Sequence, residues 1–238
     1  MGRYPNIAAS KAKTGAAKGK LYSMYAKEIY QAAKNGGTRL DANASLKRLV
    51  DKAKKEQVPS DIIKRAIDKV NSGIDESYEQ TRYEIFGPGG STVIADCLTD
   101  NLNRTVSDIR TVLNKTHTKM GAMNSVSYMY YNICMVGFRG LTEEETLDAL
   151  IESDVEALDI YTEDGITVVT GNPTDLFAIK EAITKKLPNV NFEYDELTTV
   201  AKDKINLSNE DLEIFNKLIN MLEEVEDINH VYHNVELD

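Results

Sequence analysis

RYEIFGPGGSTVIADCLTD, residues 82–100, marks the place where this chain of 238 residues changes from a helical to a strand-like pattern. Strand-like residues flank Gly87-Pro88-Gly89-Gly90, where Pro at the second position and Gly after it fit a type II turn with a glycine at positive φ. A phosphate-binding loop is the alternative for these glycines. It is disfavoured because no Gly-Lys-Ser/Thr is present and no helix directly follows. The stretch therefore predicts a β-hairpin.

Three short amphipathic helices are expected before this hairpin. Apolar residues recur at helical spacing in residues 21–35, 43–57 and 60–72. Gly36-Gly37 and Gly73 supply stops for the first and third helices, and Pro59-Ser60 suits a helix start. The sequence thus predicts a helical N-terminal domain over residues 1–78.

Two further α/β domains are expected after it. Residues 135–199 follow the order β-α-β-β-α-β, which is the ferredoxin-like pattern. A capped helix after Ser208 and a last strand near residue 231 can join residues 82–131, where SVSYMYYNI (125–133) is expected as another strand. The predicted class is α+β with three domains: the helical one, a discontinuous middle domain (79–134 plus 204–238), and an inserted ferredoxin-like domain (135–203).

Charge divides the chain sharply. Residues 1–72 hold 16 Lys/Arg against 6 Asp/Glu, a net charge of +10, and residues 73–238 hold 12 against 32, a net charge of −20. The run NIAASKAKTGAAKGK, residues 6–20, contains four lysines and no acid. Such asymmetry indicates a polyanion partner for the basic part, and the alternative is a solvated basic face on a helical domain. The candidate phosphate contacts in this part are Lys11, Lys13, Lys18, Lys20, Lys27 and Arg39.

Arg104 is a seventh candidate. It lies in Asp100-Asn101-Leu102-Asn103-Arg104-Thr105, between an expected strand and an expected helix. Asn103 or Thr105 can cap that helix, but a cation near a helix N-terminus opposes the helix dipole. A bound anion would justify Arg104, and the alternative is a structural ion pair with Asp100 or Asp108.

Chemistry typical of enzymes is not evident in the sequence. His117, His230 and His233 lack the spacing of a metal site, and Cys97 and Cys134 lie in apolar runs that suit buried thiols in a reducing cytosol. No nucleotide-binding loop, nucleophile elbow, apolar run near the ~20 residues of a membrane span, or secretory signal is found. We therefore expect a cytoplasmic protein that is not an enzyme and has no cofactor, metal, membrane or small-molecule substrate as partner.

Residues 82–110 resemble the YebC/PmpR family, which includes the mitochondrial translational activator of cytochrome oxidase subunit one. Nearly the whole chain shares the resemblance, through Asn6-Ile7 with its Lys/Gly arm, Val58-Pro59, Gly121, Ser125-Val126-Ser127 and Val231-Tyr232-His233-Asn234. Two stretches differ from the commoner pattern, Gly2-Arg3-Tyr4-Pro5 and the Leu102 position. The chain is therefore similar to a shorter, second (YeeN-like) branch. The resemblance implies three domains, the first of them helical.

The resemblance also implies a function. Members are described as DNA-binding transcriptional regulators, and also as translation factors that act on the ribosome at difficult peptide sequences. We therefore expect a nucleic-acid-binding regulator of gene expression, DNA-binding in the first interpretation. A ribosome- or rRNA-binding factor that relieves stalling is the alternative. A third hypothesis is an adaptor whose acidic ferredoxin-like surface binds basic ribosomal or polymerase proteins.

Overall fold

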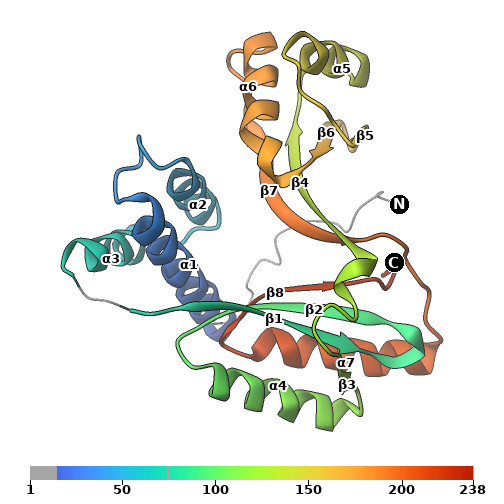
Figure 1. Cartoon of the computed structure of the whole chain (residues 1–238). Coiled ribbons are helices and arrows are strands. Elements are labelled where there is room, and N and C mark those ends of the chain that lie inside the picture. Colours follow the sequence, from blue (N-terminus) through green and yellow to red (C-terminus); the bar gives the residue numbers. More distant parts are fainter. Residues whose placement is uncertain (1–14, 74–75, 238) are drawn as a thin grey trace. The chain divides into compact units, whose positions relative to one another are not determined.

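The computed structural model describes residues 15–73 and 76–237, which fall into two compact units (Figure 1). Residues 15–127 and 205–237 belong to one, called here the helical–middle unit, and residues 128–204 form the other, the inserted unit. Helices are combined with two antiparallel sheets, which confirms the α+β class. No helix in the described ranges is both long enough and apolar enough to span a membrane.

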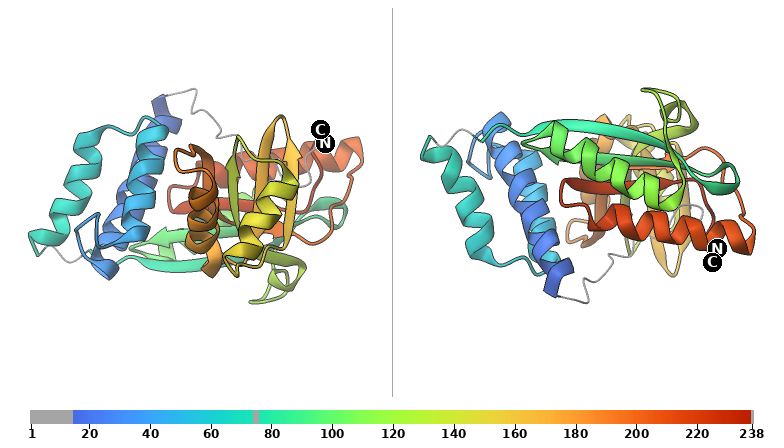
Figure 2. Two further views of the ribbon diagram at one scale, coloured as in Figure 1. Left: turned by 90° about the horizontal axis from the view of Figure 1, so that it is seen from above. Right: turned by 90° about the horizontal axis from the view of Figure 1, so that it is seen from below.

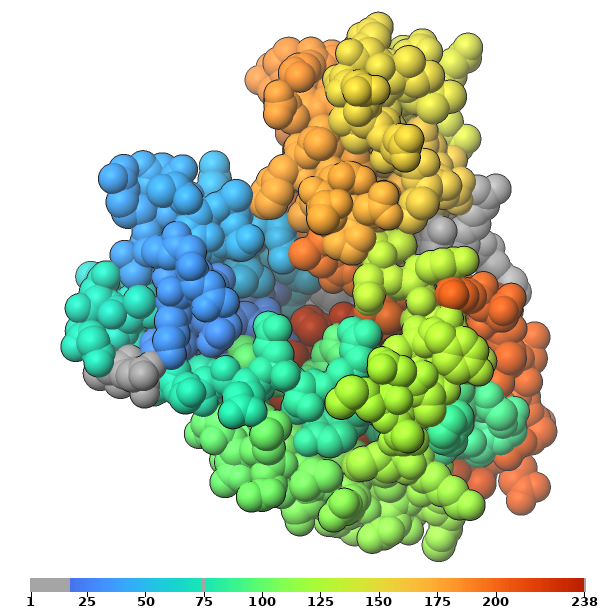
Figure 3. All heavy atoms as spheres, in the orientation of Figure 1, coloured from blue at the N-terminus to red at the C-terminus, as the bar shows by residue number. Residues whose placement is uncertain are grey.

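The N-terminal part of the helical–middle unit is helical, as predicted. Its elements are α1 (Gly15–Gly36), α2 (Ala44–Lys55) and α3 (Ser60–Asn71). Asn43 caps α2 by accepting a hydrogen bond from the Leu46 amide, and its own amide nitrogen donates to carbonyls at the end of α1. Tyr25, Ile29 and their neighbours pack between the helices as one apolar cluster. In Figure 3 these helices occupy one continuous part of the surface, in blue to blue-green.

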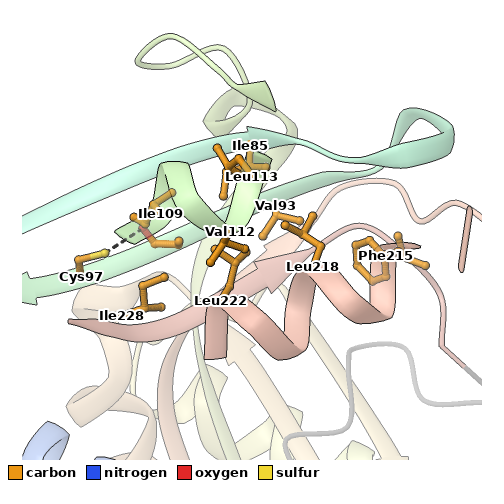
Figure 4. Packing of buried hydrophobic residues seen from close by; sticks show 12 residues of the cluster. Ile85, Val93, Cys97, Ile109, Val112, Leu113, Phe215, Leu218, Leu222 and Ile228 are labelled. Atoms are coloured by element: carbon orange, nitrogen blue, oxygen red, sulfur yellow. Dashed lines mark hydrogen bonds between the residues drawn. The ribbon is translucent and has the colours of Figure 1, made fainter. Parts of the chain in front are cut away.

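The middle part is a four-stranded sheet with two helices on one face. Its elements are β1 (Glu79–Phe86), β2 (Thr92–Thr99), α4 (Leu102–Thr116), β3 (Lys119–Met120), α7 (Asn209–Glu224) and β8 (Ile228–His233). The antiparallel strands lie in the order β3-β1-β2-β8. Figure 2 shows α4 and α7 side by side, and Figure 4 shows their apolar side chains meeting those of β1 and β2. The β1–β2 hairpin is confirmed, with Gly89 at φ 60° inside the short 3-10 helix η1 (Pro88–Gly90).

A buried carboxylate organises the loop that follows β3. Glu84 accepts hydrogen bonds from the backbone amides of Asn124 (2.7 Å), Val126 and Ser127 (3.0 Å), and from the Ser127 hydroxyl (2.8 Å). Burial disfavours the charged form of Glu84, but these bonds hold its pKa below the ordinary value. The loop is therefore held by a charge rather than by a strand ladder.

The inserted unit has the predicted ferredoxin-like topology. Its elements are β4 (Tyr130–Phe138), α5 (Glu143–Glu152), β5 (Asp159–Glu163), β6 (Ile166–Gly171), α6 (Leu176–Lys186) and β7 (Phe192–Ala201), with short 3-10 helices η2 (Ser127–Met129) before β4 and η3 (Pro173–Asp175) before α6. All neighbouring strands are antiparallel, in the order β5-β6-β4-β7. This is the arrangement of a split β-α-β fold.

The strand expected over residues 125–133 of the middle domain is wrong. Residues 130–138 form one strand, β4, which pairs with β6 and β7 of the inserted unit, and the short β3 is the edge strand of the middle sheet. No turn residue interrupts the run from Ile133 to Met135, so the strand continues through the expected boundary. The compact inserted unit begins at Tyr128, and the expected domain bounds of 79–134 plus 204–238 and of 135–203 stay predictions. The separation of residues 1–78 as a domain of their own stays a prediction.

Candidate nucleic-acid interface

One edge of α1 contacts residues 223–230 within the helical–middle unit, which comprise the end of α7, the turn after it and the start of β8 and are called here the α7–β8 turn. Lys20 Nζ donates to the backbone carbonyl of Glu223, and Lys27 Nζ lies 3.0 Å from Asp227 Oδ1. Seven residues, about two helical turns, separate the two lysines and place them on the same edge of α1. Burial lowers the pKa of Lys20 to about 8, although the charge of Glu223 opposes the shift. Two candidate phosphate contacts are thus engaged within the unit.

Glu28 extends this contact by one more residue. Its carboxylate accepts a hydrogen bond from Asn229 Nδ2 (2.8 Å), and Oε1 lies 3.3 Å from His230 Nε2. Burial disfavours the carboxylate, but the His230 and Asn229 bonds lower the pKa of Glu28. The edge of α1 therefore contacts the α7–β8 turn through positively charged lysines and a negatively charged carboxylate.

Asp227 is the centre of a buried polar network. Its side chain is 1% exposed and receives Arg104 Nε (3.1 Å) and Nη2 (2.8 Å), the Thr105 hydroxyl (2.9 Å) and Lys27. Burial alone would raise the pKa of Asp227. The hydrogen bonds from these donors outweigh burial and lower the pKa, and the bonds from Arg104 have the largest effect among them. Two of the seven candidates, Lys27 and Arg104, are thus brought together from positions far apart in sequence.

Arg104 has the acidic partners that its place near a helix N-terminus requires. Asn101 caps α4 by accepting from the Arg104 amide (3.1 Å), so the expected caps Asn103 and Thr105 are wrong. Arg104 Nη2 also lies 2.8 Å from Asp100, one of the two partners considered from the sequence. All these side-chain bonds use Nε and Nη2, and Nη1 has no hydrogen-bond partner among the described residues. These carboxylates raise the pKa of Arg104.

The remaining candidates are dispersed. Lys18 on α1 is exposed and forms no ion pair with any residue that the structure describes. Arg39, between α1 and α2, pairs with Asp41 at 2.6 Å, and both side chains are exposed. Lys11 and Lys13 lie outside the described residues. The phosphate-binding role of all seven candidates stays a prediction.

α2 carries a basic surface that sequence reasoning did not select. Its twelve residues, ASLKRLVDKAKK, contain five Lys/Arg and one acid. Lys47 and Lys54 are seven residues apart, lie on one helical face, are exposed, and have no ion partner within the described ranges. The sequence did contain a pattern that could have identified this surface, because these lysines lie outside the apolar stripe of Leu46, Val50 and Ala53.

A cleft of about 540 Å³ lies within the helical–middle unit, lined by α1, α3, the residues leading into β1, the start of α4 with Asp100 before it, and Glu226 between α7 and β8. Lys27 and Arg104 both line it. No group of three side chains suited to a metal ion occurs in the ranges that the structure covers.

Known proteins resemble the chain along its whole length. Proteins named "Probable transcriptional regulatory protein" are 46% identical in Pseudoalteromonas atlantica (94% of this chain, 92% of the relative) and 43% identical in Shewanella oneidensis (100% and 99%). A crystal structure of a conserved hypothetical protein from Aquifex aeolicus superposes with a TM-score of 0.80 at 32% identity, covering 100% of this chain and 98% of that one.

Family models agree with the two-part pattern of the sequence. The model described as "TACO1/YebC protein N-terminal domain" matches residues 2–73, and "TACO1/YebC second and third domain" matches residues 78–235. Placement in the shorter, second branch stays a prediction. The matches extend over nearly the whole chain, and the chain therefore belongs to the TACO1/YebC family.

Proposed function

We propose that this chain is a nucleic-acid-binding regulator of gene expression that acts in the cytoplasm as a DNA-binding transcriptional regulator. The names of its relatives support a regulatory role. The observation that carries the nucleic-acid part is the exposed α2 face with Lys47 and Lys54, whose charges are not matched by acids in a chain of net charge −10. Lys11, Lys13 and Lys18 add to this basic surface, with Arg39 at its edge.

The chemistry of α2 supports contact with phosphates more than with base edges. Four of its five cations are lysines, which act as point charges, and the helix contains no Asn or Gln to pair with adenine. Such a surface binds phosphates by charge and shape. It supports a second candidate function, binding to structured RNA of the translation machinery, where recognition by shape and backbone is usual.

Salt dependence tests the proposal directly. In Lys47→Ala/Lys54→Ala, the slope of log K against log salt should fall by about 0.9 per lost phosphate contact on duplex DNA, and by about 0.7 on single strands. Lys185→Ala/Lys186→Ala, on α6 of the inserted unit, removes the same charge and is the matched control. An unchanged slope in the α2 variant, or an equal change in the control, would contradict the proposal.

The two candidate targets are separated in cells. Ribosomes from gently lysed cells are sedimented after treatment with DNase or with RNase, and the chain is followed by immunoblotting. A transcriptional regulator should remain in the supernatant or be released by DNase. Cosedimentation that survives DNase and is lost with RNase would favour the translation candidate.

A further inference from the structure

The cleft in the helical–middle unit is large enough for one nucleotide. Its volume of about 540 Å³ falls in the range of about 300–1,000 Å³ that is usual for small-ligand sites. Three tyrosines and four cations line it, an aromatic and basic combination that binds unpaired nucleic acid elsewhere. The tyrosines are Tyr22, Tyr30 and Tyr78, and the cations are Lys27, Arg65, Lys69 and Arg104.

The aromatic wall has two tyrosines whose hydroxyls are bonded and a third, Tyr22, which packs partly against the helical core but whose hydroxyl is not bonded within the described residues. Tyr30 and Tyr78 meet edge to face at 5.8 Å, and both hydroxyls are bound to Glu76, at 2.8 and 2.9 Å. Tyr22 is half-buried, and its hydroxyl, like that of Ser23 beside it, has no hydrogen-bond partner in the part of the chain that the structure describes. Tyr22 is therefore the ring that can accept a base without breaking an existing bond.

Arg104 presents a fixed, unused edge to the same cleft. The bonds from Nε and Nη2 to Asp227 hold the plane of the guanidinium, while Nη1 keeps two free donors and the side chain is 44% exposed. A guanidinium fixed on one edge is prepared to bind a phosphate through the other, because little rotamer freedom is lost on binding. Arg65 on α3 adds a second exposed guanidinium to the lining, although it is ion-paired with Asp61 on the same helix.

Carboxylates in the lining limit the charge of the ligand. Glu76, Asp100 and Glu226 leave the four cations a surplus of one positive charge, which matches the charge of a single phosphodiester and is too small to neutralise a di- or triphosphate. The same carboxylates can accept hydrogen bonds from a ribose hydroxyl or from the amino group of a base. The cleft therefore suits one nucleoside monophosphate with hydrogen-bond donors of its own.

We propose that this cleft binds a single unpaired nucleotide, with its base against Tyr22 and its phosphate on the free edge of Arg104. For a nucleotide within a strand, the inference rests on the proposed nucleic-acid function. A free nucleoside monophosphate has the same chemistry, and the experiment separates the two sources.

Affinity is measured for a ten-nucleotide unstructured oligoadenylate RNA and for the RNA paired to its complement. Tyr22→Ala should weaken binding of the single strand by about 5- to 150-fold, the effect of losing one stacked base, and leave the duplex unchanged. Tyr22→Phe keeps the ring and should bind like the wild type. Tyr128→Ala, an exposed tyrosine of the inserted unit, is the matched control. Equal effects on single strand and duplex, or none beyond the control, would overturn the proposal.

A second arm uses the wild-type protein and does not depend on a folded variant. Adenosine monophosphate should shift the resonances of Tyr22 and Arg104 and compete with the RNA, while ribose 5-phosphate should do so at least fivefold more weakly. Stronger binding of the RNA than of the mononucleotide assigns the site to a strand, and the reverse assigns it to a free nucleotide. Equal binding of adenosine monophosphate and ribose 5-phosphate would show that the base contributes nothing and would overturn the proposed nucleotide site. If Lys47→Ala/Lys54→Ala left the salt slope unchanged while the cleft still bound the nucleotide, the proposed function would be contradicted and the nucleotide site would stand.

Discussion

Replacing Asp227 by Asn tests how much the buried network contributes to stability. Asp227→Asn keeps the shape of the side chain but removes its negative charge. It also replaces one acceptor oxygen by an amide N–H₂, which faces donors that include Arg104 and Lys27. Lys27 is only 11% exposed, so its charge would be left buried without a partner. Removing one member of a buried ion pair costs about 3–5 kcal/mol, and since Arg104 is still partly hydrated we expect about 3 kcal/mol.

Asp100→Asn is the matched control, because Asp100 also binds Arg104 but is 58% exposed. An exposed pair of this kind contributes about 0.2–1 kcal/mol. Urea unfolding followed by circular dichroism should give a clearly lower midpoint for Asp227→Asn, and its melting temperature should fall by about 6–12 °C. If the two variants shifted the urea midpoint equally, burial of Asp227 would not be the source of its contribution, and the reasoning would fail.

Three other predictions concern the charges and close packing of the fold. Folding lowers the pKa values of Asp227 and Glu84. The stability that these two carboxylates contribute is therefore fully present above their unfolded pKa of about 4 and is lost as pH falls through their folded pKa values. The urea midpoint of the wild type should drop from pH 6 to pH 3, and that of Asp227→Asn should drop less steeply. Glu84→Ala should cost about 1–3 kcal/mol for each buried donor left without an acceptor, and hydrogen exchange should accelerate at the three amides that Glu84 binds. Gly137→Ala should lower the melting temperature of the inserted unit, by overpacking worth about 1–3 kcal/mol, because its Cβ would lie 2.4 Å from the Tyr194 ring.

Local signals were sufficient for most of the fold. Periodic apolar residues with stops and caps predicted the three N-terminal helices, and the Ser208 cap that predicted α7 is present, with the side chain accepting from the Asp211 amide. The insertion of a ferredoxin-like unit was predicted from the order of elements alone. The error at β4 arose because strand pairing is a long-range property, and an uninterrupted apolar run does not show which sheet it joins.

The candidate site was less accessible to sequence reasoning. Arg104 stood out because its charge opposes the α4 dipole, which is a local conflict. Its main partner, Asp227, is 123 residues away in a turn whose many acids gave no reason to select one. The cleft is formed by α1, α3 and the start of α4, so it exists only after folding.

The division of charge in the sequence can now be resolved into two parts. Lys20 and Lys27 of α1 are engaged by the acidic α7–β8 turn, so part of the basic surplus holds the helical–middle unit together and is withdrawn from any polyanion. Lys47 and Lys54 on α2 have no such partner among the described residues. A phosphate that approached Lys27 on α1 would have to displace the buried carboxylate of Asp227, at a cost in stability, whereas one that approached Lys47 or Lys54 on α2 would displace only mobile counterions. Counterion release favours binding as salt falls. The polyanion should therefore bind α2 before it binds the engaged edge of α1.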